Sequence, residues 1–315
     1  MDYREIKKVA VIGSGTMGPG IAQTFARAGL DVFLVDVQPR FLDEGMQRIR
    51  DNLDVFIELE VVSAQEKNSI LARIQPTPDM EKACRQADYF MEVVPEVLEL
   101  KQKVFRQADA WCPPHTIFTT NSSNMKIDPI ATVTKRPKQV VGTHWVNPPH
   151  IMPLVEIVRG EMAADETVEA VRHFLKSIGK APIVCQDTIS YLNNAMQGAL
   201  LKSALQLLEK GVATVEDIDL AVNTGFGFRL PVVGPLAFLD MSGLDNVLHN
   251  WDYLNQVTQG GFGPSPKFIQ ELVAKGHLGI KTGKGIYDYG GKDASNIAKE
   301  KNRQLILMLK ALGRI

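Results

Sequence analysis

Short apolar runs alternate with longer amphipathic segments along the first half of the chain. The short runs are rich in β-branched residues, and the longer segments repeat their apolar residues with the period of a helix. The predicted strands are residues 9–12, 32–35, 89–94, 117–119, 140–143, 154–158 and 183–185, and the helical stretches between them include 16–28 and 40–59. This alternation is typical of β-α-β units that form a parallel sheet.

The pattern of apolar and polar residues changes after Asp187. The rest of the chain is predicted to be helical, from a first long helix over residues 192–209 to a last amphipathic helix over 294–312, with Gly and Pro between the helices. We therefore expect an α/β domain over residues 1–186, with a doubly wound sheet, and an all-α C-terminal domain over residues 187–315. No internal repeat or low-complexity segment interrupts this organisation.

Composition and charge narrow the class of partner. The chain has 315 residues, 45% hydrophobic and 23% charged, which is enough to bury the cores of two domains. Its 35 Lys and Arg residues against 36 Asp and Glu give a net charge of -1, without the basic run that nucleic acid would require. The first residues contain neither a signal pattern nor a membrane-spanning run, so the expected location is the cytosol, away from any membrane.

The three cysteines, Cys84, Cys112 and Cys185, are few and scattered. They offer no disulfide framework and no spaced metal site, so we expect buried free thiols and no metal.

A glycine motif follows the first predicted strand. Gly13, Gly15 and Gly18 form a G-x-G-x-x-G sequence at the turn from that strand into a helix. In a dinucleotide site the first glycine permits the tight turn, the second lets the pyrophosphate approach the backbone, and the third lets helix and strand pack closely. The anion then binds the free amides at the start of the helix. Glycines also serve plain turns, so this motif depends on its context.

Asp36 supplies that context, because it ends the second strand, where a carboxylate accepts hydrogen bonds from the adenosine ribose. Its charge would repel the 2′-phosphate of NADP, so the predicted cofactor is NAD. Arg40 lies close enough in sequence to leave NADP open. Together the motif and Asp36 predict a Rossmann-type dinucleotide domain.

From Val9 to Tyr289 the sequence resembles the L-3-hydroxyacyl-CoA dehydrogenase family, including 3-hydroxybutyryl-CoA dehydrogenases. The motifs that carry the resemblance are Phe118-Thr-Thr-Asn121-Ser-Ser123, His144-Trp-Val-Asn147-Pro148, Pro153-Leu-Val-Glu156, Asn194 and Lys281-Thr-Gly-Lys-Gly285-Ile-Tyr287. Several separated motifs in the same order are far more specific than any one of them. The resemblance implies oxidation of a β-hydroxy group to a ketone by hydride transfer to NAD.

The residue chemistry agrees with that reaction. Oxidation of an alcohol needs a base for the hydroxyl proton, and His titrates nearest to neutral pH. His144 closes a strand, and Glu156 lies on the returning strand, where it is expected to face His144, fix its tautomer and stabilise the imidazolium. A structural His with a solvated Glu is the alternative.

Further roles follow from the resemblance. Ser123 and Asn194 match family residues that hold the substrate, although Ser123 also suits a helix cap and Asn193 is a competing candidate. Asn147 is expected to contact substrate. Residues that match NAD contacts of the family are Glu96, Lys101 and Lys281. Glu96 is alternatively an acid placed at a helix N-terminus.

The sequence departs from the family where the substrate is expected. Positions that hold coenzyme A in the acyl-CoA enzymes correspond to Asn52 and Leu59 here, within an apolar and acidic stretch that offers nothing obvious to a 3′-phosphate. The glycine segment 225–235 is longer than usual and carries Arg229. Gulonate and carnitine dehydrogenases related to lambda-crystallin have a similar arginine, and 144–153 also looks like the dehydrogenase that oxidises a formyl-pyridine carboxylate. Arg229 suits a carboxylate, or else a salt bridge.

We therefore predict an NAD-dependent enzyme with His144, Glu156, Ser123 and Asn194 as catalytic residues. Its substrate is a small molecule, either a 3-hydroxyacyl-CoA or a small hydroxy acid. The apolar stretch 232–244 is either interior or a homodimer face. A crystallin-like protein that binds NAD without turnover is the non-enzymatic alternative.

Overall fold

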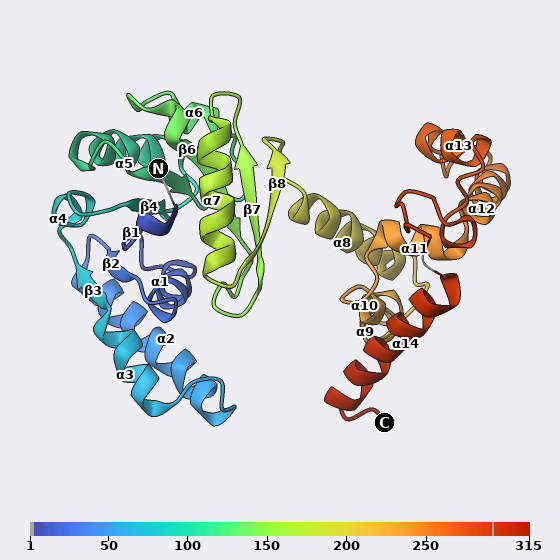
Figure 1. Cartoon of the computed structure of the whole chain (residues 1–315), viewed down its shortest axis with the longest axis horizontal. Helices are drawn as coiled ribbons and strands as arrows, with labels where there is room; N and C mark the ends of the chain where they lie inside the picture. The colour runs from blue at the N-terminus through green and yellow to red at the C-terminus, as the bar shows by residue number, and fades with distance from the viewer. Residues whose placement is uncertain (1–2, 292) are drawn as a thin grey trace. The chain divides into compact units, whose positions relative to one another are not determined.

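The computed structural model describes residues 3–291 and 293–315 (Figure 1). The chain separates into two compact units, Met1–Leu201 and Lys202–Ile315. The first unit contains the α/β part of the chain, and the second unit is helical, which confirms the predicted fold class. Within the described residues, no helix is both long and apolar enough to cross a membrane.

The first unit is built on one eight-stranded sheet with the order β3-β2-β1-β4-β5-β6-β7-β8. The strands are β1 (Lys8–Ile12), β2 (Asp31–Val35), β3 (Ile74–Thr77), β4 (Tyr89–Glu92), β5 (Ile117–Thr120), β6 (Val140–Trp145), β7 (Leu154–Arg159) and β8 (Ala181–Gln186). All neighbouring strands are parallel except β6 and β7, which are antiparallel. The order of the strands along the chain reverses between β1 and β4, and in doubly wound folds ligands bind at the carboxyl ends of the strands at such a point.

Helices cover both faces of this sheet. They are α1 (Gly18–Arg27), α2 (Pro39–Glu58), α3 (Ala64–Ala72), α4 (Met80–Cys84), α5 (Leu98–Trp111), α6 (Asp128–Ala131) and α7 (Asp165–Ser177), with short 3-10 turns at Tyr3–Glu5 and Pro137–Gln139. Strand β3 was missed by the sequence pattern because Gln75 and Pro76 interrupt its apolar run. Proline is tolerated there because β3 is an edge strand, where its missing N–H breaks no internal ladder bond.

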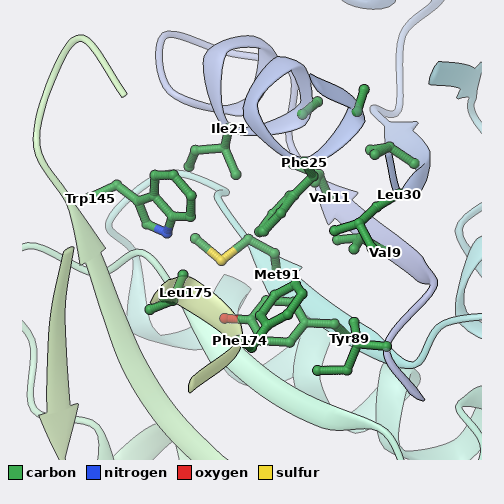
Figure 2. Close-up of a cluster of buried hydrophobic side chains, with 14 of the residues drawn as sticks. Val9, Val11, Ile21, Phe25, Leu30, Tyr89, Met91, Trp145, Phe174 and Leu175 are labelled. Atoms are coloured by element: carbon green, nitrogen blue, oxygen red, sulfur yellow. The ribbon is translucent and has the colours of Figure 1, made fainter. Parts of the chain in front are cut away.

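The core on the α1 side is strongly aromatic (Figure 2). Phe25 of α1 lies at ring distances of 5.5 Å from Trp145 and 5.8 Å from Phe174 of α7, and Tyr89 lies 4.9 Å from Phe174. On β4, Tyr89 joins this cluster while its neighbour Phe90 packs on the opposite face with Phe105. Both faces of the strand are therefore buried, as expected for a strand covered by helices on both sides.

The second unit begins at Lys202, within α8 (Asn193–Glu209). Its remaining helices are α9 (Val215–Thr224), α10 (Phe226–Arg229), α11 (Pro235–Ser242), α12 (Leu244–Val257), α13 (Lys267–Ala274), the 3-10 turn Ile280–Thr282 and α14 (Ala294–Ala311). The sequence-based boundary at residue 186 coincides with the end of β8, whereas the compact units divide at Leu201. That boundary stays a prediction.

The buried carboxylate of Asp240 holds residues 286–289 by hydrogen bonds. Its carboxylate accepts hydrogen bonds of 2.9 Å each from the Ile286 and Tyr287 amides and from the Tyr289 hydroxyl. A Cβ on Gly285 would lie only 2.2 Å from the Asp240 Oδ1 atom. The glycine of this motif is therefore required for the close approach to Asp240.

Candidate active site

The three motif glycines occupy distinct environments at the start of α1. Gly13 has φ +113°, and a Cβ there would lie 2.6 Å from the Val93 carbonyl oxygen. A Cβ on Gly18 would lie 1.9 Å from the Gly13 oxygen, whereas one on Gly15 meets no atom within 4 Å. Gly13 and Gly18 thus permit the tight turn and the close packing, and Gly15 leaves its backbone open to a ligand.

The start of α1 also leaves its amides available. Met17 is the N-cap residue, and its side chain makes no capping hydrogen bond. The free N–H groups of the first turn are the donors that a pyrophosphate accepts from. These features fit a dinucleotide with its phosphates at Gly15 and the first turn of α1.

Asp36 stands beside the same loop. Its Oδ2 atom accepts from the Ser14 amide at 2.9 Å and from the Ser14 hydroxyl at 3.1 Å. Its Oδ1 atom has only a long 3.5 Å contact with the Gln38 amide. One carboxylate oxygen therefore holds the glycine loop, and the other is free to accept from a ribose hydroxyl. The bond from Ser14 has no counterpart among the sequence predictions.

His144 and Glu156 face each other across the antiparallel pair β6 and β7, as expected from the sequence. The two residues are direct register partners, and His144 Nδ1 lies 2.7 Å from Glu156 Oε2. Both side chains are buried. If Nδ1–H donates to the carboxylate, the Nε2 lone pair remains free to act as a base.

The second oxygen of Glu156 binds the beginning of α8. Glu156 Oε1 accepts from the Leu192 amide at 3.0 Å and from the Asn193 amide at 2.8 Å. Burial raises the pKa of Glu156, but the hydrogen bonds from His144 and the Asn193 amide outweigh it and hold the pKa below its ordinary value. Glu156 is therefore ionised at neutral pH, as required to stabilise an imidazolium at His144.

The connection from β8 to α8 has an unusual backbone. Ser190 and Tyr191 have φ values of +66° and +48°, in the left-handed region that side chains rarely adopt. The Tyr191 hydroxyl donates to the Met125 carbonyl at 2.5 Å, and its ring lies 5.5 Å from that of His144. These contacts hold the two amides against Glu156. The sequence did not single out Tyr191.

Asn193 and Asn194 begin the first turn of α8, next to the His144–Glu156 pair. The Asn193 side chain donates to the Asn194 Oδ1 atom at 3.3 Å, and both residues are half-buried. Asn193 also donates its backbone amide to Glu156, which leaves the side chains of both residues as candidates for a substrate contact.

Glu96 organises the turn after β5. It accepts from the Ser123 amide at 3.0 Å, the Asn124 amide at 3.2 Å and the Ser122 hydroxyl. Within the described residues the Ser123 hydroxyl has no hydrogen-bond partner, so it is available to a substrate oxygen. Partial burial raises the pKa of Glu96, but the Ser122 hydroxyl and the charge of Lys101 bring it below its usual value.

Lys101 is buried, with only 1% of the residue exposed. Its ammonium donates to Glu92 Oε1 at 2.9 Å, to Glu92 Oε2 at 3.1 Å and to the Val94 carbonyl at 3.2 Å. It also forms an ion pair of 3.2 Å with Glu96 Oε2, so Lys101 ties Glu96 to the buried Glu92. Its predicted contact with the cofactor stays untested.

Asn121 and Asn147 lie in the loops that follow β5 and β6. Asn121 Oδ1 accepts from the Trp145 amide at 2.9 Å and so joins the ends of the two strands. Asn147 is exposed and precedes a cis peptide bond to Pro148. Ser123, two residues after Asn121, is thereby held near the end of the strand that carries His144.

Arg229 and Lys281 belong to the second unit. The Arg229 guanidinium lies 3.7 Å from the ring centroid of Phe238, and Lys281 Nζ forms an ion pair of 2.6 Å with Asp245. Both contacts are internal to that unit. The predicted roles of Arg229 toward substrate and of Lys281 toward NAD stay predictions. Among the described residues, no cluster of three or more His, Cys, Asp and Glu side chains could hold a metal ion.

Comparison with known proteins identifies the family. Residues 8–188 match the family model described as "3-hydroxyacyl-CoA dehydrogenase, NAD binding domain", and residues 191–289 match "3-hydroxyacyl-CoA dehydrogenase, C-terminal domain". These matches confirm the predicted resemblance and NAD as the cofactor.

Similar proteins span nearly the whole chain. A 5-formyl-3-hydroxy-2-methylpyridine 4-carboxylate 5-dehydrogenase from Mesorhizobium japonicum is 34% identical over 98% of both chains. A probable 3-hydroxybutyryl-CoA dehydrogenase from Bacillus subtilis is 35% identical over 91% of this chain and 99% of its own length. The crystal structure of a 3-hydroxyacyl-CoA dehydrogenase from Archaeoglobus fulgidus superposes with a TM-score of 0.82, at 34% identity, over 98% of this chain and 99% of that chain.

The first prediction concerns cofactor choice at Asp36. Asp36→Ala removes the charge that repels a 2′-phosphate and releases the Ser14 amide and hydroxyl. We expect a higher KM for NAD and a smaller preference for NAD over NADP, measured as the ratio of kcat/KM values. A wild-type enzyme that already prefers NADP would contradict this role.

The second prediction concerns the His144–Glu156 pair. His144→Ala is expected to lower kcat by roughly 10²- to 10⁴-fold, the usual contribution of a positioned base, with NAD binding near normal. In Glu156→Gln, the side-chain oxygen is expected to keep accepting from the Leu192 and Asn193 amides, so the NH₂ group of the glutamine faces His144 Nδ1. The imidazole proton then moves to Nε2, which removes the base.

The double variant tests whether the two residues act together. His144→Ala with Glu156→Gln should be no slower than His144→Ala alone, because Glu156 acts through His144. Glu161→Gln changes an exposed acid on the loop after β7 and is the matched control. Undiminished turnover in either single variant would rule out the pair as the catalytic base.

Proposed function

This chain belongs to the 3-hydroxyacyl-CoA dehydrogenase family, and we propose that it oxidises the β-hydroxy group of a 3-hydroxyacyl-CoA to a ketone. One observation carries the proposal. The Nδ1 atom of a buried histidine lies 2.7 Å from a buried, ionised carboxylate. The histidine lies near the carboxyl end of β6, on the same side of the sheet as the glycine loop that follows β1. The comparisons leave the substrate open, and its identity is our proposal.

The proposed roles follow from the geometry. His144 takes the hydroxyl proton on Nε2, and Glu156 stabilises the resulting imidazolium. Bound NAD would supply the hydride acceptor for the carbon that bears the hydroxyl group. Glu156 keeps its charge throughout because two backbone amides also donate to it.

Ser123 and Asn194 are the proposed substrate-positioning residues. The Ser123 hydroxyl is free of partners among the described residues, and its amide is held by Glu96. Asn194 stands in the turn of α8 whose first amide is bonded to Glu156. Asn147, in the exposed loop after β6, is the third candidate for a substrate contact.

A small carboxylated alcohol is the second candidate substrate, favoured by the environment of Arg229. The Arg229 guanidinium stacks on the Phe238 ring, and its Nε atom is buried. Within the described residues the guanidinium has no hydrogen-bond partner and no carboxylate partner. A stacked guanidinium presents its edge to a carboxylate in a bidentate geometry. The name of the Mesorhizobium japonicum relative also specifies a carboxylate.

Assembly as a homodimer in the cytosol completes the proposal. Helix α8 exposes Met196, Leu201 and Leu205, each more than half accessible, and α9 exposes Leu220. The stretch 232–244, predicted to be either interior or a dimer face, contains both kinds of residue: Val233 and Leu244 are buried, and Leu236 is exposed. Exposed apolar side chains at this density are typical of an interface between chains.

We expect sedimentation equilibrium to give the mass of a dimer at micromolar concentration. Leu201→Glu and Leu205→Glu together should shift the protein to the monomer by placing charge on the apolar face of α8. Glu209→Lys, at the end of the same helix, is the control. A wild-type monomer, or a variant that stays dimeric, would remove α8 from the interface.

The choice of substrate is tested with matched pairs. NADH formation is measured with 3-hydroxybutyryl-CoA, with free 3-hydroxybutyrate and with a hydroxymethyl-pyridine carboxylate. If Arg229 binds a carboxylate, Arg229→Met should lower kcat/KM for the free acids by roughly 10- to 150-fold, the worth of a hydrogen bond to a charged group. Turnover of the acyl-CoA should change little.

Arg303→Met, on exposed α14, is the control for loss of a cation in the same unit. Efficient turnover of the acyl-CoA without use of free acids would eliminate the second candidate. Turnover of the free acids alone would replace the acyl-CoA as the proposed substrate. Stoichiometric NAD binding without turnover of any β-hydroxy compound would overturn the enzymatic proposal.

A further inference from the structure

Tyr191 contacts two parts of the proposed active site that come from different segments of the chain. Its ring centroid lies 5.5 Å from that of His144, and the two ring planes are tilted by 60°. Its hydroxyl donates at 2.5 Å to the carbonyl of Met125, two residues after Ser123. One buried side chain therefore touches both the proposed base and the loop that carries a proposed substrate-positioning residue.

The loop of residues 122–127 is bonded to the connection of residues 187–191, which leads from β8 into α8. The three hydrogen bonds run from the Ile127 amide to Asp187 Oδ2 at 2.8 Å, from the Ser190 hydroxyl to Asn124 Oδ1 at 3.2 Å, and from the Tyr191 hydroxyl to the Met125 carbonyl. The bonded residues are 60 to 66 positions apart in the chain. The bond from Ser190 is exposed to water, which competes for both partners, so Tyr191 supplies the stronger side-chain attachment.

Both backbone groups of Met125 are engaged. Its amide donates to the Ser122 Oγ atom at 3.1 Å, and its carbonyl accepts from Tyr191. The Ser122 hydroxyl in turn donates to Glu96. Ser123 thus lies in a turn that Glu96 and Tyr191 hold by separate bonds, while its own hydroxyl remains available to a substrate.

The backbone around Tyr191 leaves its side chain little freedom. Tyr191 has φ +48° and Ser190 has φ +66°, in the left-handed region, and only 2% of Tyr191 is exposed. The amides of the next two residues, Leu192 and Asn193, are bonded to Glu156. Such a backbone conformation persists only where the surrounding contacts fix it, and it is concentrated at functional sites.

The phenol of Tyr191 is a hydrogen-bond donor in this arrangement. Burial raises the pKa of the Tyr191 phenol above its ordinary value, so it keeps its proton at neutral pH. That proton is directed at the Met125 carbonyl. Any role in the reaction is therefore exerted through neighbouring groups rather than by proton transfer at the phenol.

From these contacts we propose that Tyr191 is a positioning residue for the reaction. Its ring covers the imidazole of His144, and its hydroxyl sets the loop that carries Ser123, so that the base and the serine hydroxyl reach the same substrate oxygen. The inference rests on the proposed function, in which both groups act on the hydroxyl that is oxidised. Two groups that must meet one oxygen at hydrogen-bond distance are sensitive to small changes in their separation.

The kinetic test uses Tyr191→Phe, which keeps the ring against His144 and removes only the hydroxyl. With the β-hydroxy substrate that the wild type oxidises best, we expect kcat to fall by roughly 10-fold, because a slightly misplaced group slows the reaction. KM for NAD should stay unchanged. The matched control is Tyr89→Phe, which removes the hydroxyl of another buried tyrosine; within the described residues that hydroxyl has no hydrogen-bond partner.

A second background separates positioning from a general loss of structure. In Ser123→Ala no hydroxyl is left to position, so adding Tyr191→Phe should lower kcat by less than about 2-fold more. A merely structural role for Tyr191 would give the same loss in both backgrounds. Equal losses, or an unchanged kcat in the single variant Tyr191→Phe, would overturn the proposal.

Hydrogen exchange reports on the loop without turnover. The full chain, without NAD or substrate, is followed by mass spectrometry of peptides that cover residues 122–127. Tyr191→Phe should exchange these amides faster than the wild type, and Tyr89→Phe should match the wild type. Unchanged exchange in Tyr191→Phe would also contradict the proposal. Thermal unfolding confirms that each variant is folded.

The positioning role and the proposed function fail in different ways. A wild type that oxidises no β-hydroxy compound refutes the proposed function, and the role of Tyr191 in that reaction with it. An active wild type with an equally active Tyr191→Phe variant refutes the positioning role alone.

Discussion

The carboxylate of Glu156 is the interaction on which the site depends. It is buried, so it is stable as a charge only while its oxygens are fully engaged. One oxygen holds the imidazole of His144, and the other binds the first amides of α8. Burial, register and the turn into α8 therefore converge on one group, and the orientation of the base follows from all three.

Much of the fold follows from patterns that the chain displays locally. Seven of the eight strands were predicted, because buried parallel strands are short, continuous apolar runs bounded by turns. The facing of His144 and Glu156 was also predictable, since both lie on strands that a Pro-rich turn joins in antiparallel order. Strand β3 escaped because an edge strand with a proline carries little of that signal.

The contacts that sequence reasoning missed join separate elements of the fold. Lys101 is close to Glu92 in the chain, but its burial against that carboxylate depends on how α5 packs on β4. Met125, His144 and Tyr191 come from three separate segments, and only the folded chain brings them together. Composition and period report the burial of a segment, and they do not report which polar groups meet after packing.

The amides that Glu156 receives at the start of α8 have a further consequence. The same two hydrogen bonds fasten the connection after β8, with its left-handed Ser190 and Tyr191, and depress the pKa of the carboxylate. Ionisation of Glu156 and attachment of this connection are therefore thermodynamically linked. Since the folded pKa is depressed, their mutual stabilisation is present above the pKa of an unfolded glutamate and is lost as pH falls through the folded value. Detaching the segment would in turn make the acid easier to protonate, so the helix that leads out of the nucleotide-binding part of the chain is also an electrostatic support of the proposed base, His144.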